Sequence, residues 1–307
     1  MLTLICACLI GGAAFDDQPE AAATVTESRW AVILTGLPGD DDHAELFAAT
    51  GDAWQKWLTE ELGIPAGQVI RLSGSISAEK PVQAEKPAEA EKSNPPVSAA
   101  DQIRDTLASL GEKLKPEDAL WIFTLGHGSF DGKRAWFHVA GRDPSAEDFG
   151  RWLEGVKCRE QVLWLTHSSS GWWVKRLSQP GRIVIAATAA EDESNETEFP
   201  HALATVAGRS PEQLDRNGDG KVSVAELYLA VVAEVERRFK SDKRVPTEHA
   251  QLDDDGDGRG TEELDAVTEK PESKSSDGEL ARKTFISYRN AAKNPDDDTT
   301  KENANRR

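Results

Sequence analysis

Cysteine is scarce in this sequence, and basic residues are outnumbered by acidic ones. Of the three cysteines among 307 residues, Cys6 and Cys8 lie in an apolar N-terminal stretch and Cys158 stands alone. A fold held by several disulfides is therefore excluded. With 36 Lys and Arg against 54 Asp and Glu, the formal net charge is −18. We expect no nucleic-acid or anionic-membrane surface, because such surfaces need clustered Lys and Arg.

Apolar runs long enough to cross a membrane are also missing. The apolar stretch at residues 1–14 is shorter than the roughly 20 residues of a transmembrane helix, so we expect no span. It is similar to the core of a signal peptide ending in small residues, although no positively charged segment precedes it. The alternatives to a signal peptide are a lipoprotein box around Cys6 and Cys8 and a frayed apolar terminus. We favour export to the periplasm, the cell surface or the medium, with residues 15–28 as a linker.

Short apolar runs alternate with segments of helical spacing from residue 29 onward. Strands are expected at residues 30–35, 68–72, 119–125, 161–166 and 182–187. Helices are expected at residues 43–62, 98–114, 146–155 and 172–177, with a hairpin-like stretch at 135–140. This alternation predicts an α/β fold with a mainly parallel sheet and helices on both faces. Residues 75–97 repeat AEKP-like units without a packable face, which predicts a disordered insertion.

Two polar turns directly follow predicted strands. His127 and Gly128 come after residues 119–125, and Ser168, Ser170 and Gly171 come after residues 161–166. Ligands of such sheets bind beyond the carboxyl ends of the strands, so we expect both turns at one edge. A histidine within about 3 Å of a serine hydroxyl can act as its base, and backbone N–H groups of the turns can stabilise an oxyanion. The alternative is a turn-capping histidine beside a serine-rich loop.

Three blocks of sequence together resemble the legumain-like branch of the caspase-fold cysteine peptidases. They are WAVILTG, WIFTLGHGSFDG and LWLTHSSSG, and a weaker block, IVIAATAAEDES, is similar to the strand and loop that line the family's specificity pocket. The resemblance covers residues 29–208 and implies a caspase-like domain there. It places the family's catalytic histidine on His127 and its catalytic cysteine on Ser168. The sequence therefore departs from the family at the nucleophile.

The departure at Ser168 changes the expected activity. A serine hydroxyl is nearly un-ionised at neutral pH, whereas a thiol is partly thiolate. The family's orienting polar residue is altered too, since Pro38 stands near its place. We expect no ordinary cysteine-peptidase activity, and instead the binding of a peptide or protein segment at the strand-end cleft. A slow hydrolase using Ser168 and His127 is the alternative. Cys158, a strand away from Ser168, is expected to be structural, and His167 to pack or lie at the rim.

Residues 215–226 match the EF-hand pattern for Ca²⁺ at every diagnostic position. The expected oxygen ligands are Asp215, Asn217, Asp219, the carbonyl of Lys221, Ser223 and Glu226. Gly220 occupies the sharp turn, and Val222 lies where a short strand pairs two loops. Residues 226–239 predict the exiting helix. The alternative is an Asp/Gly turn without a metal.

A second acidic stretch, Asp253, Asp255 and Asp257, repeats the first half of this motif 38 positions later. That offset suits a pair of EF-hands, but the twelfth position is Leu264, so the stretch is either a weak site or an acidic turn. We expect a helical EF-hand-type region over residues 209–266. A largely disordered tail with one short helix at 280–288 follows over 267–307. A calcium-dependent interaction protein whose α/β domain is only a scaffold also stays open, as does the oligomeric state.

Overall fold

The computed structural model describes residues 28–75, 98–262, 264 and 277–289. The predicted signal peptide, nearly all of the predicted linker and nearly all of the predicted insertion lie outside the described residues. Among the residues that are described, no helix combines the length and the apolar character needed to cross a membrane.

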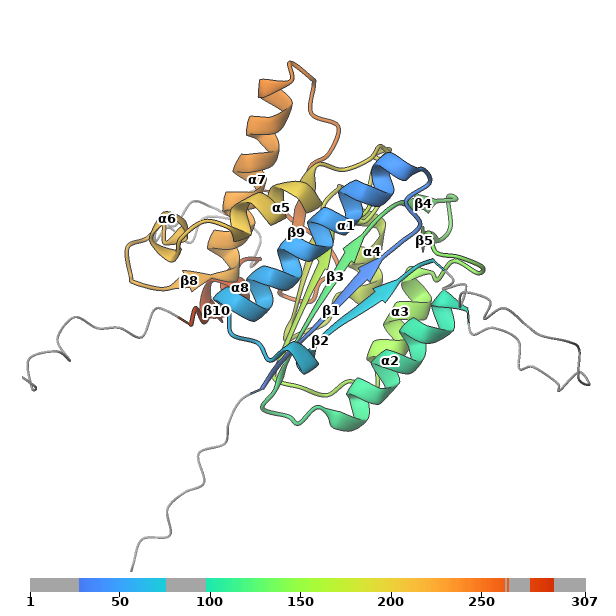
Figure 1. The fold of residues 1–307 in the computed structure, drawn as a ribbon, viewed down its shortest axis with the longest axis horizontal. Helices are drawn as coiled ribbons and strands as arrows, with labels where there is room; N and C mark the ends of the chain where they lie inside the picture. The colour runs from blue at the N-terminus through green and yellow to red at the C-terminus, as the bar shows by residue number, and fades with distance from the viewer. Residues whose placement is uncertain (1–27, 76–97, 263, 265–276, 290–307) are drawn as a thin grey trace, which may run out of the picture.

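A six-stranded sheet forms the centre of the molecule (Figure 1), with the strand order β2-β1-β3-β6-β7-β9. The strands are β1 (Arg29–Thr35), β2 (Val69–Ser73), β3 (Ala119–Leu125), β6 (Glu160–Leu165), β7 (Arg182–Ala186) and β9 (Gln251–Asp253). Neighbouring strands are parallel, except that β9 runs antiparallel to β7. Two antiparallel ribbons pair β4 (Gly128–Phe130) with β5 (Ala135–Phe137) and β8 (Val222–Ser223) with β10 (Phe285–Ile286).

Helices cover both faces of the sheet. Successive side chains of each strand point to opposite faces, and most of them are apolar, so both faces must be covered. Ile33, Phe123 and Trp164 pack with one set of helices, and their chain neighbours pack with the other. The first set is α1 (Asp41–Lys56) with its π-helical extension η1 (Trp57–Glu61), α5 (Phe199–Ala207), α6 (Pro211–Leu214), α7 (Val224–Ser241) and α8 (Glu279–Lys283). The second set is α2 (Ala99–Lys113), α3 (Ala146–Leu153) and α4 (Gly171–Leu177). A short 3₁₀ turn, η2 (Ala66–Gln68), precedes β2. The predicted α/β class with a mainly parallel sheet is confirmed.

The helices begin where the sequence provides N-caps. Ser98 accepts a hydrogen bond from the backbone N–H of Asp101 at the start of α2, as its position before an amphipathic segment predicts. Ser145 and Asp148 form a reciprocal capping box at α3. Asp40 caps α1 by accepting from the N–H of His43. These local signals explain why the predicted helix starts lie close to the observed ones.

The C-terminal elements share the core of the α/β fold. Helix α7 packs on α5, and Leu227 and Val231 of α7 lie in the same apolar cluster as Leu252 of β9. Val222 pairs with Ile286 of β10, so the expected pairing of Val222 with the second acidic loop is wrong. That loop follows β9, which is hydrogen-bonded into the main sheet instead. In the predicted tail, α8 ends at Lys283 and the chain continues as strand β10 where the helix was expected to run on.

Candidate functional site

The two polar turns lie side by side at the carboxyl edge of the sheet. They follow β3 and β6, which are adjacent and parallel. Gly128 makes the approach possible, because a Cβ at this position would lie 2.5 Å from the carbonyl oxygen of Ser168. The structure thus brings His127 and Ser168 onto neighbouring turns.

No hydrogen bond joins His127 to Ser168. The Nε2 atom of His127 lies 3.3 Å from the carbonyl oxygen of Pro38, and its ring contacts those of Phe47 and His43 at centroid distances of 5.5 and 5.7 Å. Ser168 is only 3% exposed, and within the described part of the chain its hydroxyl has no hydrogen-bond partner. A working dyad needs the base within about 3 Å of the hydroxyl or one water away. The arrangement is therefore that of a buried serine without a base.

Ser170 and Gly171 hold the turn against the end of β7. The Ser170 hydroxyl accepts hydrogen bonds from the backbone N–H groups of Ala187 at 3.0 Å and Thr188 at 3.3 Å. The N–H of Gly171 donates to the Thr188 hydroxyl at 3.0 Å. A Cβ on Gly171 would collide with the backbone of Ala189, so only glycine fits there. The expected oxyanion role of Gly171 is wrong, because its N–H is already bonded.

Ser169, between these residues, adopts a left-handed backbone conformation with φ at 58°. This region is unfavourable for a residue other than glycine, at a cost of about 1–3 kcal/mol. Its N–H donates to the carbonyl oxygen of Glu193 at 3.1 Å. The turn is therefore strained at Ser169, and the backbone N–H groups of Ser169 and Gly171 are hydrogen-bonded within the protein.

His167 and Cys158 are structural. His167 is fully buried between the rings of Phe137 and Trp173, and its Nδ1 lies 2.7 Å from the Thr124 hydroxyl. Burial lowers the pKa of His167 to about 3, so the imidazole is neutral at physiological pH. Cys158 lies before β6, at the opposite edge of the sheet from Ser168. Burial also raises the pKa of its thiol, which makes it a poor nucleophile.

A charged triad that the sequence did not indicate lies beside His127. The Nδ1 atom of His43 lies 2.6 Å from Asp40 Oδ1, and its Nε2 atom lies 3.0 Å from Glu196 Oε2. The hydrogen bond with Asp40, and then that with Glu196, raises the pKa of His43. Asp40 is recognisable in sequence as a helix cap, but Glu196 lies 153 residues away from His43 and no local pattern predicts it.

A cavity of about 290 Å³ opens beside His127. Pro38 and Phe47, which both contact His127, form part of its wall together with Ala48 and Leu72. Its walls are mostly apolar, with Arg71 as the charged lining residue. The cavity can accommodate a small apolar group against Phe47 and Leu72.

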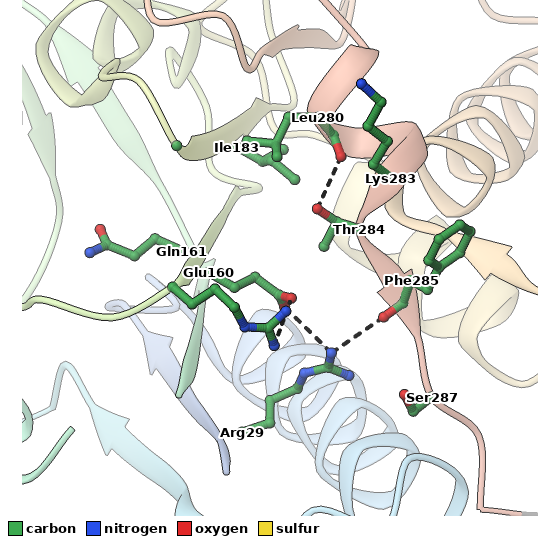
Figure 2. Close-up of a pocket in the computed structure, with 11 residues that line it drawn as sticks. Arg29, Glu160, Gln161, Ile183, Leu280, Lys283, Thr284, Phe285 and Ser287 are labelled. Atoms are coloured by element: carbon green, nitrogen blue, oxygen red, sulfur yellow. Dashed lines mark hydrogen bonds and ion pairs between the residues drawn. The ribbon is translucent and has the colours of Figure 1, made fainter. Parts of the chain in front are cut away.

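A more polar cavity of about 320 Å³ lies at the opposite, amino edge of the sheet (Figure 2). There the Nη2 of Arg29, at the start of β1, lies 3.4 Å from Glu160 Oε1 and donates to the carbonyl oxygen of Phe285 at 3.3 Å. The Thr284 hydroxyl donates to the carbonyl of Leu280 one turn earlier, at the end of α8. The Arg29 contact with Phe285 attaches the α8–β10 segment to the sheet, far from the two polar turns.

The first acidic loop is closed by hydrogen bonds to its own backbone. Both carboxylate oxygens of Asp215 accept N–H groups, those of Gly218 and Gly220 at 2.7 and 2.9 Å. The two glycines have φ values of 73° and 80°, which favour glycine. The buried Glu226 accepts from the N–H groups of Arg216 at 2.9 Å and Ser223 at 2.8 Å.

Within this first loop, Asn217 and Asp219 also bond to each other, with the N–H of Asp219 donating to Asn217 Oδ1 at 2.8 Å. The Lys221 N–H donates to Asp219 Oδ1 at 2.9 Å, and Ser223 caps α7. Of the described acidic, histidine and cysteine side chains, one trio gathers its ligand atoms within 4.8 Å, and it is not in this loop.

That trio is Asp253, Asp255 and Asp277. Two of the three residues expected at the second loop are therefore brought together. Asp257 is not part of the group, and its Oδ1 accepts the N–H of Arg259 at 2.7 Å. Asp277 comes from the segment leading into α8, and nothing in its local sequence indicated it. Burial raises the pKa of Asp253.

The chain matches no protein-family model and no curated protein. Among solved structures, it is similar to protein GSU0716 from Geobacter sulfurreducens at 13% identity and a TM-score of 0.40, over 74% of this chain and 92% of that chain. It is also similar to drICE, a caspase, at 10% identity and a TM-score of 0.36, over 76% of this chain and 90% of that chain. At such low TM-scores, neither likeness bears on the chemistry of the site.

Proposed function

We propose that the protein is an exported, calcium-binding homologue of the legumain-like, caspase-fold peptidases that lacks cysteine-peptidase activity. Its role is to bind a peptide or protein segment at the carboxyl edge of the sheet. The observation that carries the proposal is the pair of neighbouring turns, in which Ser168, at the position that the resemblance assigns to the nucleophile, has no hydrogen bond to a base. Export is supported by the apolar pattern of residues 1–14.

The chemistry of Ser168 supports the loss of activity. A serine must transfer its proton to a base during attack, and His127 instead directs Nε2 at the carbonyl of Pro38. A positioned general base contributes about 10²–10⁴-fold to a rate. The N–H groups of Ser169 and Gly171 are bonded within the protein, and losing one oxyanion donor costs about 10²–10³-fold. Together these deficits leave little hydrolysis above background.

Binding at this edge is supported by the cavity beside His127. An extended segment crossing the ends of β1 and β2 would reach the apolar walls formed by Phe47, Ala48 and Leu72. Apolar pockets with a few polar groups at the rim are the usual features of a ligand site. Thr35, Arg71 and Ser73 supply polar groups here. The segment would therefore place one small apolar side chain in this cavity, against Phe47.

Calcium binding by residues 215–226 is supported by the chemistry of the donors. The side chains of Asp215, Asn217, Asp219, Ser223 and Glu226, with the Lys221 carbonyl, offer only oxygen, which Ca²⁺ prefers. Gly218 and Gly220 already adopt the left-handed conformations of a tight loop. When bound, the ion would neutralise the acidic loop and connect it to the start of α7. Extracytoplasmic calcium is high enough for weak sites of this kind.

The test of the catalytic proposal is hydrolysis of a fluorogenic peptide library by wild type, Ser168→Ala and Ser168→Cys. We expect no cleavage by wild type or Ser168→Ala. Iodoacetamide-insensitive cleavage by wild type that disappears in Ser168→Ala would overturn the proposal in favour of a serine hydrolase. Cys158→Ser is the matched control, because it removes the one other thiol outside the predicted signal peptide that a cysteine reagent could modify. For calcium, calorimetric titration should show that Glu226→Gln removes one calcium site. Equal calcium affinities in wild type and Glu226→Gln would refute calcium binding by the first loop.

A further inference from the structure

We propose a second calcium site, formed by the carboxylates of Asp253, Asp255 and Asp277. It lies on the loop that follows β9 and takes its third ligand from the segment entering α8. This set differs from an EF-hand loop, in which all ligands come from twelve consecutive positions. The proposal does not depend on the peptidase assignment or on the first acidic loop.

The spacing of the three carboxylates suits one ion. One oxygen from each lies within 4.8 Å of the others. Calcium binds oxygen at about 2.3–2.6 Å, so two oxygens on the same ion can be up to about 5 Å apart. Three carboxylates this close repel one another when no cation lies between them. A divalent ion removes that repulsion without requiring the side chains to move far.

An unpaired oxygen of Asp253 points independently to a ligand. Asp253 is 0% exposed, and its Oδ1 accepts hydrogen bonds from the Ser178 hydroxyl at 3.0 Å and the Gly256 N–H at 3.3 Å. Its Oδ2 is buried and has no hydrogen-bond partner. Buried carboxylate oxygens are normally paired, because leaving one unpaired costs the full desolvation free energy. A bound cation supplies the missing partner for this oxygen.

Asp277 takes the place of the glutamate that normally closes an EF-hand loop. The residue at that position, Leu264, is buried in the apolar core and cannot coordinate an ion. Asp277 is itself buried, and its Oδ1 accepts the N–H of Asp254 at 3.1 Å. The Asp254 carboxylate in turn accepts the N–H groups of Gly278 and Ala281 at 2.8 and 2.7 Å. These bonds hold the start of α8 against the loop with Asp277 facing the cluster.

The ion would tie two parts of the fold together. The loop follows β9, which is a strand of the main sheet, whereas Asp277 lies just before α8 and β10 in the chain. Strand β10 pairs with β8, which lies within the first acidic loop. Calcium at the new site would therefore strengthen the attachment of the α8–β10 segment.

The test is calorimetric titration of the full chain with CaCl₂ in a Glu226→Gln background, where the first loop is disabled. We expect one remaining site, weakened roughly tenfold or more by Asp277→Asn and by Asp255→Asn. Asp257→Asn is the matched control from the same loop and should leave the affinity unchanged. Asparagine at 277 can still accept the Asp254 N–H, and Asp255→Asn provides a second variant if Asp277→Asn does not fold.

Three outcomes would overturn the site. They are the absence of calcium binding in the Glu226→Gln background, loss of binding in Asp257→Asn with Asp277→Asn unaffected, and equal affinity for Mg²⁺. Hydrogen exchange gives a separate readout, because calcium should slow exchange in residues 277–289, and unchanged exchange would contradict the proposed link. Failure of the first loop would appear differently, as equal numbers of sites in wild type and Glu226→Gln.

Discussion

Replacing Glu248 by glutamine should stabilise the protein at neutral pH, although it removes a carboxyl group from a helix start. Glu248 is 5% exposed, and its Oε1 accepts the N–H of Glu198 at 2.9 Å, at the beginning of α5. Its Oε2 is buried without a partner. Burial, aided by the nearby Glu198 and Glu193, raises the pKa of Glu248 to about 8. The helix N-terminus favours the charged form by at most about 2 kcal/mol, which is less than the desolvation cost.

The size of the effect follows from proton linkage. In the unfolded chain this carboxyl ionises near pH 4.5, whereas in the folded protein it stays protonated up to about pH 8. Folding therefore binds a proton between these values, and each pH unit costs about 1.36 kcal/mol. At pH 7 this linkage lowers the free energy of unfolding of the wild type by roughly 3 kcal/mol. Above pH 8 the reduction reaches roughly 5 kcal/mol. Glutamine has the shape of the neutral acid and does not titrate, so the variant avoids this loss.

The assay is urea unfolding followed by tryptophan fluorescence from pH 4 to pH 9, with EGTA present. Glu248→Gln should be more stable than wild type by roughly 3 kcal/mol at pH 7, and the difference should vanish towards pH 4. Glu112→Gln, at an exposed position of α2, removes the same charge and should have little effect. A Glu248→Gln variant that is less stable than wild type at pH 7, with a deficit that shrinks towards pH 4, would instead show that the folded carboxylate is ionised and caps α5.

Three further substitutions test other parts of the structure. Gly171→Ala should lower the free energy of unfolding by about 1–3 kcal/mol in chemical denaturation, because the new methyl group would collide with the backbone of Ala189. Glu234→Gln should cost about 1.5–3 kcal/mol in the same assay, since this buried carboxylate accepts hydrogen bonds from three arginine side chains, and no change would show that they contribute nothing. The pKa of His43 is raised chiefly by Asp40, so His43 stabilises the fold below pH 6.5 and loses this effect as pH rises through its folded pKa. His43→Ala should therefore reduce the unfolding midpoint more at pH 5.5 than at pH 8.5, and equal reductions would contradict the ion pairing.

The strands were predictable because their signal is local. The run 119–125 is apolar except for Thr124 and forms β3 with the same bounds, as expected for a strand buried on both faces. Ser98 predicted the start of α2 because a cap needs only a side chain three residues from its donor. The sharing of one sheet edge by the turns after β3 and β6 likewise depends only on strand direction.

The state of the candidate nucleophile could not be predicted this way. The resemblance placed the family's nucleophile position on Ser168 at a strand-end cleft, but the fold buries this residue, because Ser170 and Gly171 bond the turn to the end of β7. These bonds join residues 17 positions apart, beyond the reach of any periodic pattern.

Residue types and their spacing determined by themselves the α/β layering, the helix starts, the identity of Ser168 at the turn and the oxygen-rich character of both acidic loops. Only the tertiary structure decided which carboxylates meet. It gathered Asp253 and Asp255 with the distant Asp277, and left the loop with the stronger sequence pattern bonded to its own backbone. The physical reason is that apolar patterns and caps act over a few residues. Charge clusters are instead assembled by packing between segments far apart in the chain.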